Sequence, residues 1–185
     1  PRIEAAAREF GAEVCMTKAD HQSGTDRLQE VANKLNLASD QIVVNVQGDE
    51  PMDTPQMVSE ALQPMLNDDQ INIVNLMAEI TGVEEFEDVN TVKVVTNPDG
   101  DALYFSREAV PSRAKWSGDV PMQKQVCVIP FRRDYLLEFN KTPEMPLEQI
   151  ESVDMLRVLE SGGQVRMVPT TFPTIGVDTP KHLEM

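Results

Sequence analysis

The strongest constraint on the fold is a short apolar run that ends in a glycine and two acids. The run 42–46, rich in β-branched aliphatic residues, is followed at once by Gln47, Gly48, Asp49 and Glu50. Such a run predicts a strand covered on both faces, and strands of this kind belong to parallel sheets. Ligands of open α/β sheets bind beyond the carboxyl ends of the strands, so these acids are placed to face a ligand.

A second acid, Asp178, follows another short apolar stretch near the other end of the chain. Carboxylates are the ligands that Mg²⁺ takes when it bridges substrate phosphates, so Asp49 and Asp178 are candidates to share one metal ion. Each motif also has a purely local interpretation. Asp49, Glu50 and Asp53 are common turn residues, and Asp178 precedes a Thr-Pro pair that could begin a helix.

Composition excludes several classes of protein. The chain has 185 residues, enough for one core, and a formal net charge of −15, which argues against nucleic-acid binding. No apolar run approaches membrane-spanning length. Cys15 and Cys127 lack metal-ligand or redox spacing, so we expect structural thiols in a reducing, cytoplasmic location.

The hydrophobic pattern alternates between strands and helices. It predicts helices at 1–10, 26–35, from 55 onward, 134–139 and 148–160, and strands at 13–17, 42–46, 71–80, 91–96, 102–106, 126–131 and 164–168. The turn sequence at 97–100 predicts a hairpin between two of these strands. This order is typical of an α/β fold with a mainly parallel sheet and an antiparallel insertion in its second half.

Several motifs together resemble one enzyme family. The matching segments, in family order, are 15–17, 21–27, 44–51, 92–95, 102–107, 146–151, 156–157 and 176–180. The chain resembles the cytidylyltransferases that activate 3-deoxy-manno-octulosonate (KDO), the CMP-KDO synthetases of Gram-negative bacteria. Members of that family begin with a strand and a basic phosphate loop that this sequence does not contain, so we expect a fragment that is inactive alone.

The resemblance implies one Rossmann-like nucleotidyltransferase domain over residues 1–185. An insertion at about 91–150 is expected to bind the sugar and to pair two subunits into a homodimer. The implied reaction transfers CMP from CTP to the anomeric hydroxyl of KDO, releases pyrophosphate and gives CMP-KDO for lipopolysaccharide or capsule synthesis. Positioning and electrostatics carry most of the catalysis in such transfers, so no nucleophilic side chain is required.

The resemblance also implies roles for individual residues. The nucleotide is expected to contact Ser23, Gly24, Thr25 and Arg27. Mg²⁺ is expected on Asp49 and Asp178, which with Arg107 form the catalytic set. The sugar is expected to contact Gln47, Arg107, Gln125, Glu148, Glu151 and Asp154, with Arg107 on its carboxylate.

Simpler interpretations of the same residues stay open. Ser23 or Thr25 could be an ordinary helix N-cap, and Arg107 could form a surface ion pair. The acids at 148, 151 and 154 share one helical face, which could be solvated. Lys93 could be a cation of the site or an edge-protecting lysine.

Departures from the family pattern cluster around the sugar. Gln125 stands where familiar members have a histidine, Ile129 where they have a tyrosine, and Asp154 where they have a glutamate. A related sugar acid, such as 8-amino-3,8-dideoxy-manno-octulosonate or a sialic-acid-type sugar, is therefore an alternative substrate. A noncatalytic nucleotide-sugar-binding domain is a further alternative.

Overall fold

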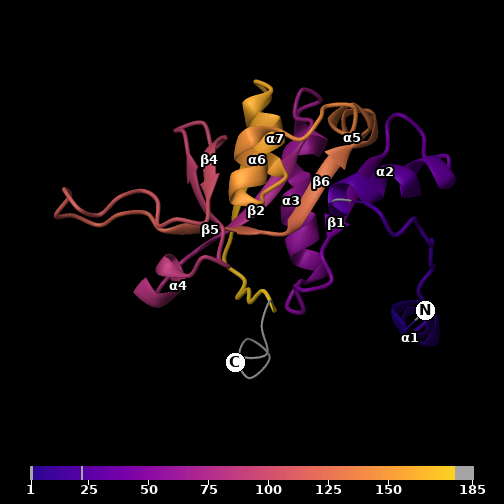
Figure 1. Ribbon diagram of the computed structural model, residues 1–185, viewed down its shortest axis with the longest axis horizontal. Helices are drawn as coiled ribbons and strands as arrows, with labels where there is room; N and C mark the ends of the chain where they lie inside the picture. Colours follow the sequence, from indigo (N-terminus) through magenta and orange to yellow (C-terminus); the bar gives the residue numbers. More distant parts are fainter. Residues whose placement is uncertain (1, 22, 178–185) are drawn as a thin grey trace.

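The computed structural model describes residues 2–21 and 23–177 as an α/β structure (Figure 1). Its helices are α1 (Arg2–Glu9), α2 (Gly24–Lys34), α3 (Pro55–Asn67), α4 (Val83–Glu87), α5 (Arg133–Phe139), α6 (Pro146–Glu151) and α7 (Met155–Glu160). Its strands are β1 (Ile42–Val46), β2 (Val74–Glu79), β3 (Lys93–Thr96), β4 (Ala102–Ser106), β5 (Gln123–Val126), β6 (Val128–Arg132) and β7 (Arg166–Thr170). The loop between β4 and β5 extends away from the sheet.

The expected α/β class is confirmed, but strand pairing is mixed and not mainly parallel. Five strands lie in the order β4-β3-β5-β2-β7, and β1 pairs with β6. Among the described strands, β2 and β7 form the parallel pair and the other pairings are antiparallel. The reason is the segment 123–132, which runs back through the molecule and pairs with β2 through β5 and with β1 through β6. The strand predicted at 126–131 is this segment, interrupted at Cys127.

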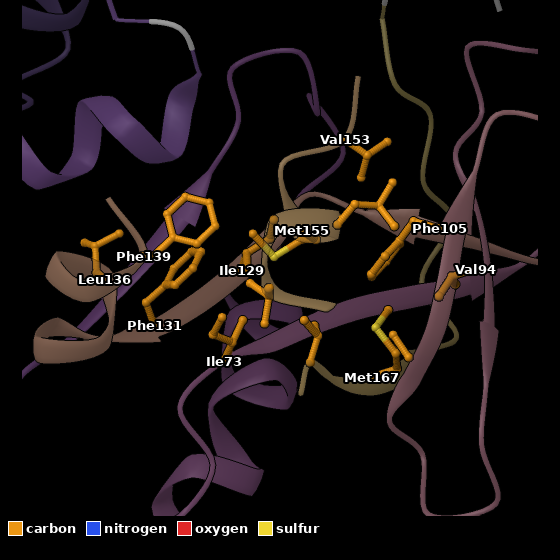
Figure 2. Close-up of a cluster of buried hydrophobic side chains, with 14 of the residues drawn as sticks. Ile73, Val94, Phe105, Ile129, Phe131, Leu136, Phe139, Val153, Met155 and Met167 are labelled. Atoms are coloured by element: carbon orange, nitrogen blue, oxygen red, sulfur yellow. The ribbon is translucent and has the colours of Figure 1, made fainter. Parts of the chain in front are cut away.

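Two apolar clusters lie on opposite faces of β2. The side chains of Val74 and Leu76 pack against α3, whereas those of Ile73 and Met77 belong to the cluster on the other face. This alternation is what a strand buried on both faces requires. Figure 2 shows the second cluster, in which Ile129, Phe131 and Phe139 lie close to Met155.

Two local predictions are wrong, and one helix was missed. Residues 13–17 form no strand, and the helix α4 was not expected. The single helix predicted at 148–160 is two helices, because Ser152 takes a left-handed conformation with φ of 53° and ends α6. The hairpin at 97–100 and the helices α2, α3 and α5 are confirmed, within a residue or two at their ends.

No helix in the described part of the chain combines the length and the apolar character needed to cross a membrane.

Candidate active site

A cleft of about 1450 Å³ lies where the ends of β1, β2 and β7 meet the start of α2 and the junction of α6 with α7. Its position beyond the carboxyl ends of these strands is the one expected for ligands of α/β sheets. The predicted site residues that line it are Ser23, Gly24, Gln47, Asp49, Arg107, Gln125, Glu148 and Asp154. Thr25, Arg27 and Glu151 are not among the lining residues, and Asp178 lies outside the described part of the chain.

The predicted nucleotide loop is built as a helix N-terminus. Ser23 caps α2, because its Oγ accepts a hydrogen bond from the backbone N–H of Asp26 at 3.1 Å. Thr25 is fully buried and donates to Oδ2 of Asp154 at 2.6 Å, which ties the loop to the start of α7. Arg27 donates to Oγ1 of Thr17 and to the backbone carbonyl of residue 18. The N-cap interpretation of Ser23 is therefore confirmed. Ser23 and Gly24, at the N-terminus of α2, line the cleft.

The segment after β1 carries a cluster of acids. Asp49 is exposed at the cleft. Burial, helped by the charges of Asp53 and Asp49, raises the pKa of Glu50 to about 7. The pKa of Asp53 is raised as well, by burial and by Asp49. Both carboxylate oxygens of Asp53 are buried without a hydrogen-bond partner among the described residues. This accumulation of negative charge is chemically suited to a hard cation.

The segment that precedes Asp178 lies against Asp49. The backbone N–H of Val177 donates to the carbonyl oxygen of Asp49 at 2.8 Å, so the residue that precedes Asp178 in the sequence adjoins the first predicted metal ligand. Within residues 2–21 and 23–177, no group of three or more histidine, cysteine, aspartate or glutamate side chains has the geometry to hold a metal ion.

Arg107 is held at the cleft by backbone carbonyls. Its Nε donates to the carbonyl oxygen of Glu151 at 2.6 Å, and its two terminal nitrogens donate to the carbonyl oxygens of Val89 and Ser152 at 2.9 and 3.2 Å. The Glu151 carboxylate accepts a hydrogen bond from the backbone N–H of Arg107 at 2.8 Å. Glu151 also accepts from Tyr104 and Ser106. Glu151 therefore fixes the end of β4 and does not face the cleft.

Lys93 fits neither of its two sequence interpretations. β3 lies between β4 and β5, so Lys93 does not protect a sheet edge, and its side chain is fully buried away from the cleft lining. Its Nζ donates to the carbonyl oxygens of Asp88, Thr91 and Arg107. Burial lowers the pKa of Lys93. Its hydrogen bonds link the turn before β3 to the backbone of Arg107.

A buried ion pair joins the nucleotide side of the cleft to α6 and α7. Arg157 is 3% exposed and donates to both carboxylate oxygens of Glu148, at 2.8 and 2.5 Å. It also reaches Asp26 in the first turn of α2 at 3.2 Å and lies over the ring of Phe139. Burial raises the pKa of Asp154, the neighbouring acid that Thr25 contacts. The acidic face predicted here is therefore not a solvated one.

Sequence reasoning missed two polar residues of the site region. Lys124 lines the cleft, pairs with Glu85 at 2.5 Å and donates to the carbonyl oxygen of Thr174 at 3.0 Å. Asn75, in the middle of β2, accepts a hydrogen bond from Gln125 at 2.6 Å. For Asn75 the available signal was an amide residue in an otherwise apolar strand, whereas Lys124 lies among the polar residues of β5 and had no such signal.

Cys127 lines the cleft. Burial raises its pKa well above the usual value, and the nearby carboxylates of Glu50 and Asp154 act in the same direction. Both cysteines of the chain are free. The thiol of Cys127 therefore stays protonated near neutral pH.

Comparison with known proteins assigns this chain to a family. The family model described as cytidylyltransferase matches residues 1–167. The chain therefore belongs to the cytidylyltransferase family, and the nucleotidyltransferase class expected from the motifs is confirmed.

The names of similar proteins specify the sugar as well as the nucleotide. The 3-deoxy-manno-octulosonate cytidylyltransferase of Geobacter metallireducens is 44% identical to this chain. The alignment spans 193 positions including gaps and covers 99% of this chain and 75% of the relative. The enzyme of the same name from Solibacter usitatus is 43% identical, over 99% of this chain and 71% of the relative. A solved structure of CMP:2-keto-3-deoxy-manno-octonic acid synthetase complexed with CTP has a TM-score of 0.88 and 40% identity, over 100% of this chain and 74% of that one.

Proposed function

We propose that this protein transfers CMP from CTP to the anomeric hydroxyl of KDO and releases pyrophosphate. The observation that carries the proposal is that one cleft gathers the predicted nucleotide residues Ser23 and Gly24, the acid Asp49 and the predicted sugar residue Gln125. The relatives named as KDO cytidylyltransferases and the neighbour complexed with CTP support the same reaction.

Asp49 and Asp178 are the residues that would hold a divalent ion, which we propose to be Mg²⁺. The hydrogen bond between Val177 and Asp49 supports this pairing, and so does the unrelieved charge around Glu50 and Asp53. When bound, such an ion lowers the pKa of the attacking hydroxyl and screens the charge between the two anionic substrates. The ion matters here because Arg107 and Lys124 are the basic residues among the described lining of a strongly acidic cleft.

The residues of the chain bind and orient the substrates. We propose that the N-terminus of α2, at Ser23 and Gly24, holds the nucleotide. Thr25 and Arg27 do not line the cleft and would fix the loop through their hydrogen bonds to other segments. In-line attack then depends on holding the sugar hydroxyl against the α-phosphate, because positioning supplies most of the rate enhancement in phosphoryl transfer.

On the sugar side, Arg107 is proposed to hold the carboxylate. Three of its N–H groups donate to backbone carbonyls, which orients the guanidinium and leaves two of its five N–H groups for a ligand. Gln47, Gln125, Glu148 and Asp154 line the cleft and are the proposed contacts to sugar hydroxyls. Glu151, the remaining residue of the predicted sugar site, is proposed to orient Arg107 through their hydrogen bonds.

The insertion at about 91–150 is proposed to carry sugar binding and the homodimer contact. The antiparallel strands β3, β4 and β5 and the long loop before β5 lie in this region, together with β6 and α5. The cytoplasmic location and the lipopolysaccharide or capsule pathway stay predictions.

The test is pyrophosphate release by the full-length protein with Mg²⁺ and CTP, using KDO, 8-amino-3,8-dideoxy-manno-octulosonate and N-acetylneuraminate in parallel. Release that depends on KDO supports the proposal. Release with one of the other sugars alone would change the substrate, and no release with any of the three would favour the binding-domain alternative.

A further inference from the structure

Asn75 occupies a buried position in β2 where its contacts allow only one orientation of the side-chain amide. The residue is 0% exposed. Its Nδ2 donates to the carbonyl oxygens of Leu76 at 2.9 Å and of Val126 at 2.7 Å. An amide nitrogen has two hydrogens, and both are used here. The opposite orientation would place Oδ1 against two carbonyl oxygens, so the assignment of nitrogen and oxygen follows from the contacts.

The fixed amide of Asn75 in turn fixes Gln125. Oδ1 of Asn75 can only accept, and it lies 2.6 Å from the terminal nitrogen of Gln125. The Gln125 nitrogen must therefore face Asn75, and its Oε1 lies at the opposite corner of the planar amide group, directed away from Asn75. Among the described residues nothing donates to this Oε1, and it is not one of their buried unpartnered atoms. Because Gln125 lines the cleft, the oxygen is open to a ligand.

We propose that Asn75 is a positioning residue that sets Gln125 as a hydrogen-bond acceptor in the sugar half of the cleft. Position 125 then recognises a donor group of the sugar acid, a hydroxyl or an ammonium, and disfavours a group that can only accept. Without Asn75 the Gln125 amide could rotate by half a turn and present its nitrogen instead, which would remove this discrimination. The proposal rests on the proposed function, since it specifies a contact of that same substrate.

A double-mutant cycle tests whether Asn75 acts through Gln125. The variants are Asn75→Leu, Gln125→Met and the pair together, in the full-length protein with KDO and CTP. Each single variant is expected to raise the KM for KDO by about 10-fold, the size of one net hydrogen bond, with the KM for CTP unchanged. The pair is expected to resemble Gln125→Met alone, because the effect of Asn75 requires the glutamine. Effects that multiply, or that fall equally on CTP, would overturn the proposal.

A conservative variant supplies a pH readout that a merely structural role would not move. In Gln125→Glu the side chain can donate to Asn75 only while it is protonated. The KM for KDO of this variant is therefore expected to rise with pH as the carboxyl group ionises, while the wild-type profile lacks this step. A variant profile identical in shape to that of the wild type would contradict the orientation of the amide.

The orientation itself can be measured without turnover. In ¹⁵N-labelled full-length protein, one side-chain N–H of Gln125 is expected to exchange slowly with solvent, and Asn75→Leu is expected to abolish that protection. Fast exchange of both protons in the wild type would overturn the inference even if KDO is a substrate. Protected exchange in a protein that does not turn over KDO would instead uphold the orientation and refute the proposed function.

Discussion

At the scale of single residues, Glu50 makes stability depend on pH. Its pKa is about 7 in the folded protein, against 4.5 for an ordinary glutamate carboxyl group in water. Between these values the unfolded chain ionises while the folded protein stays protonated. In the presence of a chelator, the free energy of unfolding should therefore fall as pH rises from 4.5 to 7, by up to about 3 kcal/mol.

Urea unfolding across this pH range measures the effect, with Glu50→Gln as the test variant. The variant cannot ionise, so it should lack this fall and be more stable than the wild type above pH 7. Asp99→Asn, in the turn after β3, is the matched control and should keep the pH dependence of the wild type. Equal pH profiles for wild type and Glu50→Gln would show that Glu50 titrates normally.

Arg107 is the residue on which the sugar assignment depends. Arg107→Ala should raise the KM for KDO about 10- to 100-fold, because a charge-assisted contact to the sugar carboxylate is lost, and should leave the KM for CTP nearly unchanged. Steady-state kinetics with each substrate varied in turn measures this. Arg113→Ala, an arginine outside the cleft lining, is the control and should change neither KM. A larger effect on CTP would move Arg107 to the nucleotide side.

At the scale of elements, the Arg157–Glu148 pair holds α6 and α7 against α2. Arg157→Met leaves the buried Glu148 carboxylate without its partner and should cost about 3–5 kcal/mol of unfolding free energy. Lys141→Met, which removes an exposed ion pair with Glu138, should cost about 1 kcal/mol or less. Chemical denaturation measures both. Similar losses for the two variants would mean that the buried pair contributes no more than a surface pair.

The break between α6 and α7 has its own test. Ser152 ends α6 at φ 53°, a conformation that glycine adopts without a side-chain penalty. Ser152→Gly should therefore stabilise the protein by about 1 kcal/mol, whereas Ser152→Ala should not. Thermal unfolding checks this, and a destabilised Ser152→Gly variant would show that the serine side chain supports the turn.

Elements whose signals are local were predictable. The strand at 42–46 and the helix that begins after Thr54 follow from apolar runs and capping residues a few positions away. The αL break at Ser152 was not, because serine carries no strong preference for that conformation. The direction of pairing was not predictable either, since it depends on the segment 123–132 returning between two strands far from it in sequence.

The candidate site was predictable to the same extent. Asp49 and Ser23 could be placed at the cleft because each follows or precedes an element that the sequence marks clearly. The partners of Asn75 and Arg157 could not, because their contacts join residues 50 and 131 positions apart. The family resemblance implied that position 125 contacts the sugar, but not that Asn75 holds its side chain.

At the scale of the whole molecule, the protein is acidic and its cleft is acidic, yet both proposed substrates are anions. We therefore expect chelation of divalent ions to abolish turnover, and added Mg²⁺ to restore it.

Asp49→Asn should lower kcat at least 100-fold, an estimate based on the electrostatic contribution of charge-stabilising groups. Asp99→Asn is again the control, because it changes the same charge in an exposed turn. Full activity of Asp49→Asn would remove Asp49 from the site.

The central claim is that CMP is joined to the anomeric carbon of KDO in this cleft. It is tested most directly by NMR of the product formed from CTP and KDO labelled with ¹³C at the anomeric carbon. The account predicts a coupling between that carbon and a single phosphorus, with pyrophosphate formed in equal amount. Pyrophosphate and free CMP without this coupling, or no product, would contradict it.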